Sequence, residues 1–136
     1  MDDVIFACVH SAGRSQMAAA FFNRLADPAK ARAVSAGTEP AERVHPEVVE
    51  AMREAGHDLS RARPSLLTRE AAASARLLVT MGCGEACPYV PGLEREDWPL
   101  ADPKGRGLDE VRRIRDEVRG RVERLVGQRG WGRPAR

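Results

Sequence analysis

Short apolar runs alternate with segments of helical periodicity along the first part of the chain. The runs 4–7 and 77–81 are short enough to be buried strands, and 31–36 is interpreted as another strand. An alanine-rich segment over 15–22 and the segment 46–55 carry apolar residues at helical spacing. The pattern therefore predicts an alternation of strands and helices.

Two further helices follow from the same pattern. A short helix is interpreted over 68–74. Apolar residues then recur at three- and four-residue steps from Leu108 to Leu125, with charged residues between them, which predicts a long amphipathic helix. We expect Gly127 and Gly130 to end this helix.

This order of elements is typical of the α/β class. We expect a single domain over 1–128, built on a four-stranded parallel sheet with helices on both faces, and a flexible C-terminal tail over 129–136. Ligands of such sheets bind at the carboxyl ends of the strands. Cys8 and Cys83 each follow a predicted strand, so both are expected at that edge.

Composition and charge narrow the functional class. The 136 residues include 22 basic and 20 acidic side chains, so a net charge of +2 provides little attraction for nucleic acid. No apolar run approaches the length of a membrane span, and the first residues lack the pattern of a secretory leader. We expect a cytoplasmic monomer that binds neither nucleic acid nor a membrane. In that reducing compartment, cysteines are more often reactive, metal-ligating or buried than bridged in disulfides.

The segment from Cys8 to Ser15 is the strongest candidate for chemistry. A cysteine and an arginine are separated by five residues, between a predicted strand and the start of a helix. Such a loop can turn backbone N–H groups inward as an anion-binding nest, and the helix adds its partial positive charge. Arg14 can offer its planar guanidinium to two oxygens. The expected ligand is a tetrahedral oxyanion, bound by Val9, His10, Ser11, Ala12, Gly13 and Arg14.

The same surroundings favour a reactive thiolate at Cys8. We expect Ser15 to donate a hydrogen bond to it, and Gly13 to allow a positive φ or a close backbone approach. The alternative is a buried cysteine that lies near an arginine by chance, which the strand, loop and helix context disfavours. His10 could tune the loop, although a surface or packing histidine is the more ordinary interpretation.

Cys83 and Cys87 form a second candidate site. In a helical turn, side chains four residues apart lie at a spacing that a disulfide tolerates. Glycines and prolines flank the pair, so we do not expect one rigid helix there, and mobility would let Cys83 reach Cys8. A zinc site and an inert pair are the alternatives. Zinc usually requires four ligands at characteristic spacings, which the histidines of the chain do not complete.

The segment 97–103 is a third candidate, because it carries two carboxylates among aromatic and proline residues. Asp102 precedes Pro103, which favours an extended conformation, and Asp102 could protonate a departing oxygen as a general acid. Asp97 is the competing candidate. Taken alone, Asp-Pro is more often an ordinary turn.

Together these motifs resemble the low-molecular-weight protein tyrosine phosphatase superfamily, and specifically its thioredoxin-coupled arsenate reductase branch. The resemblance covers nearly the whole chain and rests on the loop from Cys8 to Arg14 with Ser15-Gln16-Met17-Ala18, on Ser35-Ala36-Gly37-Thr38, on His45-Pro46, on Val79-Thr80-Met81 and on Asp102-Pro103. Many phosphatases share the Cys-x5-Arg spacing, whereas Cys83 and Cys87 make the match specific. It implies a low-molecular-weight phosphatase-like fold.

By this resemblance, Cys8 attacks arsenate while Arg14 and the loop amides hold its oxygens, and Asp102 assists the loss of water. Cys83 then attacks Cys8, which releases arsenite and leaves a disulfide between the two cysteines. Cys87 resolves that disulfide by attacking Cys83, and thioredoxin reduces the final pair. The resemblance implies no bound cofactor, since the electrons come from thioredoxin or a small thiol.

Some features of the family are not carried over. Members that bind potassium usually have asparagine where this chain has Ser11 and glutamate where it has Ala19, so a potassium site is not expected. No other metal site is predicted. Three other functions stay open: a hydrolytic phosphatase with a phosphocysteine at Cys8, a reductase served by mycothiol, bacillithiol or glutathione, and a thiol-based metalloid or redox sensor. Cys87 favours thioredoxin, because a small-thiol mechanism needs no second resolving cysteine.

Overall fold

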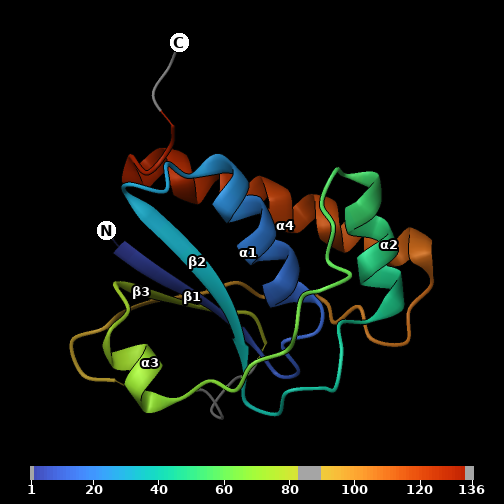
Figure 1. Cartoon of the computed structure of the whole chain (residues 1–136), viewed down its shortest axis with the longest axis horizontal. Coiled ribbons are helices and arrows are strands. Elements are labelled where there is room, and N and C mark those ends of the chain that lie inside the picture. The colour runs from blue at the N-terminus through green and yellow to red at the C-terminus, as the bar shows by residue number, and fades with distance from the viewer. Residues whose placement is uncertain (1, 83–89, 134–136) are drawn as a thin grey trace.

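A parallel sheet forms the centre of the computed structural model. The structure describes residues 2–82 and 90–133, and within these ranges the strand order is β2-β1-β3-β4 (Figure 1). The strands are β1 (Asp2–Cys8), β2 (Ala31–Gly37), β3 (Leu77–Thr80) and β4 (Glu94–Asp97). The helices are α1 (Arg14–Leu25), α2 (Pro46–Glu54), α3 (Arg69–Ala73) and α4 (Leu108–Arg129). The expected α/β fold with a four-stranded parallel sheet is confirmed.

Side chains along β1 alternate between two cores. Val4, Phe6 and Cys8 belong to one cluster of buried residues. Ile5 and Ala7 belong to a second cluster, on the opposite side of the sheet. A parallel strand that is buried on both faces has a continuous apolar sequence rather than an alternating one. This is why the short apolar run at the start of the chain could be recognised as a strand.

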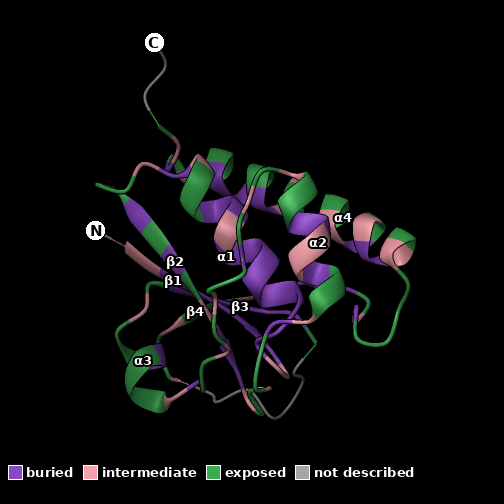
Figure 2. Ribbon diagram, turned by 45° about the vertical axis from the view of Figure 1, so that its right-hand side comes forward, coloured by how far each residue is buried: buried purple, intermediate pink, exposed green. Residues whose placement is uncertain are grey.

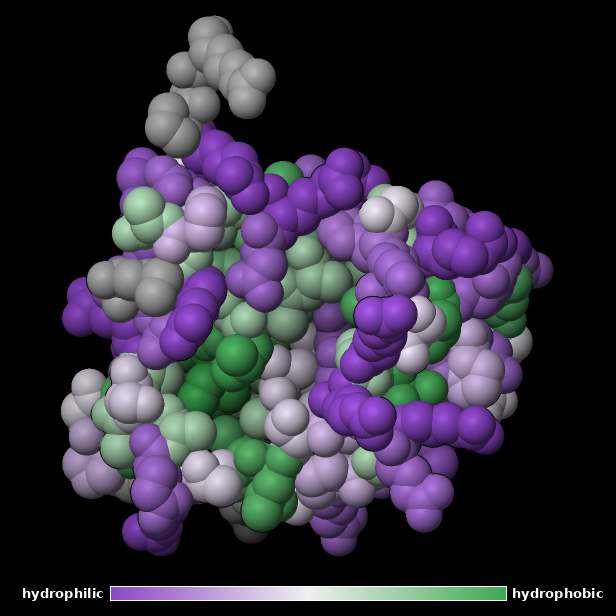
Figure 3. All heavy atoms as spheres, in the orientation of Figure 1, coloured by the Kyte–Doolittle hydropathy of each residue, from purple (hydrophilic) through white to green (hydrophobic). Residues whose placement is uncertain are grey.

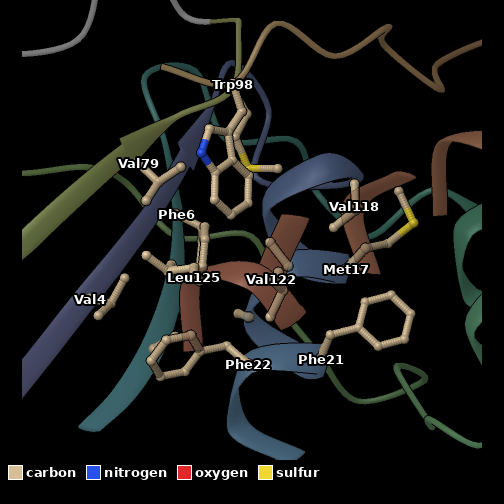
Figure 4. Close-up of a cluster of buried hydrophobic side chains, with 14 of the residues drawn as sticks. Val4, Phe6, Met17, Phe21, Phe22, Val79, Trp98, Val118, Val122 and Leu125 are labelled. Atoms are coloured by element: carbon tan, nitrogen blue, oxygen red, sulfur yellow. The ribbon is translucent and has the colours of Figure 1, made fainter. Parts of the chain in front are cut away.

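The helices cover the two faces of the sheet unequally. α1 and α4 pack on one face, with α2 against α4, and α3 lies on the other (Figures 1 and 2). The larger core includes Phe6, Phe22, Trp98 and Leu125 (Figure 4). On the α3 side, Val34 of β2 is 51% exposed, and hydrophobic surface is visible beside β2 in Figure 3. Helices therefore lie on both faces, as predicted, but most of the core lies on one.

The C-terminal helix α4 is longer than its apolar pattern predicts. It continues to Arg129, so the expectation that Gly127 ends it is wrong. Gly130 ends the helix with a φ of 69°, a left-handed conformation that glycine adopts without a steric penalty. Among the described helices, including this one, none is both long enough and apolar enough to cross a membrane.

The chain beyond α4 is attached to the core. Trp131 is 6% exposed, and its ring centroid lies 5.7 Å from that of Phe22. Its Nε1 donates a hydrogen bond to Asp2 Oδ2 at 3.1 Å. The expectation of a flexible tail over 129–136 is therefore wrong for Trp131, because an indole that is buried and hydrogen-bonded belongs to the folded domain.

The hydrophobic pattern does not predict β4. The four residues of this edge strand are Glu-Arg-Glu-Asp, and three of them are exposed. It pairs in parallel with β3, from Leu77 opposite Glu94 to Thr80 opposite Asp97. Backbone hydrogen bonds rather than apolar alternation define this strand, so its sequence resembles that of a charged loop.

Candidate active site

The carboxyl ends of the strands meet at one edge of the sheet, where the loop between β1 and α1 lies (Figure 1). Cys8 is the last residue of β1, and Arg14 is the first of α1. Gly82 follows β3 with a φ of +100°, and a Cβ there would overlap the guanidinium of Arg14. Cys83 and Cys87 lie outside the described residues. The residue that precedes Cys83 is nevertheless in direct contact with Arg14.

The Cys8 thiol lies at the end of a chain of hydroxyl groups. Cys8 is 2% exposed, and its Sγ lies 2.9 Å from Ser15 Oγ, so the expected contact with Ser15 is present. Ser15 Oγ shares a hydrogen bond with Ser35 Oγ (2.6 Å), which shares another with Ser11 Oγ (2.8 Å). The N–H of Ser65 also donates to Ser11 Oγ at 3.3 Å. These contacts hold the Ser15 hydroxyl against the sulfur.

Sequence reasoning missed Ser35 as a member of the site. Ser35 lies in β2, next to Phe6 of β1 in the register of the sheet. A hydroxyl residue near the carboxyl end of a strand that neighbours the reactive loop is the signal that could have identified it. A serine within a short strand is too common for that signal to stand alone.

Arg14 is buried beneath the segment that follows β4. The side chain is 6% exposed, and its Nη1 donates to the carbonyl oxygen of Leu100 at 3.1 Å. Its Nη2 lies 3.6 Å from Asp102 Oδ2. The buried Nε has no hydrogen-bond partner among the described residues. An unsatisfied buried donor costs about 1 to 3 kcal/mol, so Arg14 is prepared to donate to an acceptor that enters the site.

Hydrogen bonds to its carbonyl oxygens orient the backbone of the loop. Each carbonyl oxygen from Cys8 to Gly13 accepts a hydrogen bond from a group outside the loop, at 2.8 to 3.3 Å. The donors, in chain order, are the N–H groups of Thr38, Glu39 and Ala41, the side-chain amide of Gln16, and the N–H groups of His45 and Met17. Because the described peptides are trans, each N–H points away from the carbonyl of its own peptide.

The N–H groups of residues 9–14 consequently point away from the segments that surround the loop. None of these six N–H groups donates to another residue in the part of the chain that the structure describes. They lie at the N-terminus of α1, whose capping residue Gly13 provides no side-chain acceptor. A row of free N–H groups at the positive end of a helix is an anion-binding arrangement.

Two residues of the loop have special backbone requirements. Gly13 has a φ of −143°, so the predicted close approach holds rather than the predicted positive φ: a Cβ there would lie 2.6 Å from Pro103 Cγ. The positive φ falls instead on Ser11, at 51°. This conformation is uncommon for residues other than glycine and persists only where surrounding contacts hold it.

Of the two candidate carboxylates, Asp102 is the one that reaches Arg14. Its side chain is 42% exposed, and its Oδ1 accepts a hydrogen bond from the N–H of Lys104 at 3.0 Å. Asp97 ends β4, and its Oδ1 accepts a hydrogen bond from Thr80 Oγ1 at 2.8 Å. Of the two predicted carboxylates, Asp102 is therefore the one that lies beside Arg14.

Two histidines border the loop. Nδ1 of His10 lies 3.2 Å from the carbonyl oxygen of Glu39, and the ring centroids of His10 and His45 are 6.5 Å apart. Burial lowers the pKa of His45, although the nearby charge of Asp102 opposes this shift. A histidine with a lowered pKa is neutral at pH 7, so His45 does not supply the positive charge of the site. Within residues 2–82 and 90–133, no cluster of His, Cys, Asp or Glu side chains is suited to hold a metal ion.

A parallel sheet with a cysteine loop that runs into a helix at an arginine defines a phosphatase-like class of α/β protein. The low molecular weight phosphotyrosine protein phosphatase family matches residues 3–129, and the chain belongs to this family.

Relatives with arsenate reductase names are similar over nearly the whole chain. A Halobacterium salinarum protein, provisionally named an arsenate reductase, is 39% identical over 129 residues, which cover 90% of this chain and 89% of the relative. The glutaredoxin arsenate reductase of Synechocystis is 34% identical over 131 residues (94% and 98% covered). The structure of a thioredoxin-dependent arsenate reductase of Corynebacterium glutamicum matches with a TM-score of 0.81 and 38% identity, over 94% of this chain and 61% of that chain.

Proposed function

We propose that the chain is an arsenate reductase in which Cys8 attacks the arsenic atom. The observation that carries this proposal is the group of unpaired donors beside the thiol, namely the N–H groups of residues 9–14 and the buried Nε of Arg14. Such a set of donors suits a small tetrahedral oxyanion. The names of the relatives favour arsenate as that oxyanion.

In the first step, the thiolate of Cys8 forms a bond to arsenic, and one arsenate oxygen leaves as water. Ser15 donates a hydrogen bond to the sulfur and stabilises the thiolate before attack. Arg14 and the loop N–H groups hold the remaining oxygens, while Asp102 supplies the proton to the departing oxygen. Arsenic is still As(V) in the resulting adduct.

The reduction occurs in the second step, for which Cys83 attacks the sulfur of Cys8. A bond between the two sulfurs forms, the bond between sulfur and arsenic breaks, and its electron pair stays on arsenic, which leaves as As(III) in arsenite. Cys87 then attacks Cys83 and frees Cys8 as a thiolate. The two electrons lost by the protein now correspond to a disulfide between Cys83 and Cys87.

Thioredoxin is the proposed electron donor. Cys87 provides a second resolving thiol, which moves the disulfide away from the buried Cys8. The Corynebacterium relative is thioredoxin-dependent, and the Synechocystis relative is named for glutaredoxin. The reducing cytoplasm is the proposed compartment, because thiols of this kind are regenerated there. The proposed mechanism uses no resident cofactor.

Disulfide mapping by mass spectrometry tests the relay. The reduced protein is treated with arsenate, alkylated and digested. We expect a bond between Cys83 and Cys87 in the wild type, and a bond between Cys8 and Cys83 in Cys87→Ser. Arsenite release without any disulfide among the three cysteines would contradict the proposed order of events.

Hydrolysis of a phosphate ester is the second candidate function, since the family is named for phosphatases and the same donors would hold a phosphoryl group. Cys8 would then form a phosphocysteine that water cleaves. Cys83→Ser separates the two functions. Loss of arsenate reduction with retained ester hydrolysis supports the relay, whereas unchanged arsenate reduction in Cys83→Ser would exclude it.

A further inference from the structure

Gln16 is a buried amide in the first turn of α1, and it is 7% exposed. Its Nε2 donates to the carbonyl oxygen of Ser11 at 2.9 Å and to that of Arg63 at 3.1 Å. Both protons of the amide group are therefore used. The other loop carbonyls, from Cys8 to Gly13, are held by backbone N–H groups. Within the described residues, the carbonyl of Ser11 is thus the loop carbonyl whose orientation depends on a side chain.

The peptide that joins Ser11 to Ala12 carries two groups with opposite effects on an anion. Its N–H is one of the free donors, and its carbonyl oxygen carries a partial negative charge. Because the peptide is trans, holding the carbonyl outward turns the Ala12 N–H toward the oxyanion site. Rotation of this peptide would remove that donor and direct an oxygen at the anion instead.

The backbone of Ser11 has an uncommon conformation, which persists only where surrounding contacts hold it. Its φ of 51° lies in the left-handed region, which costs a serine about 1 kcal/mol or more. Contacts on its hydroxyl come from Ser35 and Ser65, but these do not touch the carbonyl. Gln16 acts on the carbonyl directly and ties it to Arg63, in the same segment as Ser65.

We infer that Gln16 is a positioning residue of the oxyanion site, which holds the Ser11 carbonyl outward so that the Ala12 N–H faces the anion. This inference rests on the proposed function of the loop as an oxyanion site. The residue type fits the task, since a neutral amide offers two donors to two carbonyls. A carboxylate of the same length would place acceptors against acceptors, and a shorter amide would not span them.

Nuclear magnetic resonance of the wild-type protein gives a first test, with an internal control. The chain contains two glutamines, and Gln128 on α4 is exposed. We expect the side-chain amide protons of Gln16 to exchange with solvent at least about ten times more slowly than those of Gln128, because both Gln16 protons are hydrogen-bonded to backbone carbonyls and the side chain is 7% exposed. Equal exchange of the two side chains would overturn the inference even if no Gln16 variant folds.

Binding of inorganic phosphate gives the second test, by calorimetry on wild type, Gln16→Met and the matched control Gln128→Met. Methionine keeps the length of the side chain and removes its donors. We expect the phosphate Kd and the arsenate KM of Gln16→Met to rise at least about tenfold, the usual effect of a lost hydrogen bond to a charged group. Gln128→Met should match the wild type.

These outcomes separate positioning from mere structural support. A residue that only stabilises the fold would lower Tm and leave the Kd of the folded fraction unchanged. A Gln16→Met protein that is folded and binds phosphate within twofold of wild type would overturn this inference alone. Failure of the wild type to bind phosphate would overturn both the inference and the proposed function.

Discussion

The loop from Cys8 to Arg14 and the segment from Trp98 to Lys104 meet at the same site but are held very differently. Each carbonyl of the loop up to Gly13 is hydrogen-bonded, and the thiol is 2% exposed. In the other segment, Trp98 is anchored in the core, whereas Asp102 is 42% exposed and meets Arg14 at 3.6 Å.

This difference separates two tasks. Donors that stabilise developing charge must already be oriented when the reaction occurs, since reorganising them would add to the barrier. A general acid must instead deliver its proton to the leaving oxygen, and a partly exposed side chain can adjust its position to do so. We therefore expect changes in the loop to weaken anion binding. Changes in the segment from Trp98 to Lys104, here called the acid segment, should lower kcat.

Arg14→Lys should have the largest effect, because Arg14 joins the two regions. Arg14 uses three separate nitrogens for Leu100, Asp102 and the anion, whereas a lysine carries all its donors on one atom and cannot reach the three positions together. We expect kcat/KM for arsenate to fall by about 10² to 10³-fold. Steady-state kinetics measures this loss, and Arg124→Lys on the exposed side of α4 is the matched control. A loss below threefold would show that the bidentate group is not needed.

Asp102→Asn should lower kcat and leave anion binding intact. The substitution removes the proton donor, which typically costs about 10² to 10⁴-fold. It also removes a negative charge beside Arg14, so the phosphate Kd should stay the same or decrease. Asp97→Asn is the control, because Asp97 is hydrogen-bonded to Thr80. Equal losses of kcat in the two variants would contradict the assignment of Asp102.

Gly13→Ala should push the two regions apart. The new Cβ would lie 2.6 Å from Pro103 Cγ, so the acid segment must move. We expect kcat to fall about tenfold and the free energy of unfolding to drop by about 1 to 3 kcal/mol, as is typical of overpacking. Adding Pro103→Ala removes the atom that clashes and should restore part of both. A double variant no better than Gly13→Ala would exclude this steric explanation.

His45 should produce the smallest effect, on the pH dependence of stability. Its ring lies beside Gly13 and Pro103, and burial lowers its pKa in the native state from the ordinary value of 6.5. The unfolded state therefore binds the proton more readily. The contribution of His45 to the free energy of unfolding is therefore fully present above pH 6.5, and it is lost as the pH falls through the lowered pKa.

Urea unfolding at pH 7.5 and 5.5 measures this contribution. Between these two values, the wild type should lose more stability than His45→Asn does. His57→Asn is a positive control, because burial also lowers the pKa of His57, which contacts Phe21 away from the site. An unchanged pH slope in His45→Asn would show that His45 does not contribute.

Much of the fold could be predicted because its signals are local. The apolar runs gave β1 and β3, and helical spacing gave α2 and most of α4. Prediction failed where a residue is placed by distant partners. β4 is charged and is recognised only by its pairing with β3, and Trp131 packs against Phe22 and is hydrogen-bonded to Asp2, both of which are distant in the sequence.

The sequence by itself determined the chemistry that we propose for the site, because a cysteine, an arginine and a serine at fixed spacing between a strand and a helix predict a nucleophile, a donor and an anion-binding nest. The tertiary structure decided which groups hold that nest: the backbone of 38–45, the amide of Gln16 and the hydroxyl of Ser35. Every residue except proline carries the same N–H and C=O, so a sequence cannot show which donor meets which carbonyl. Only the packed chain can.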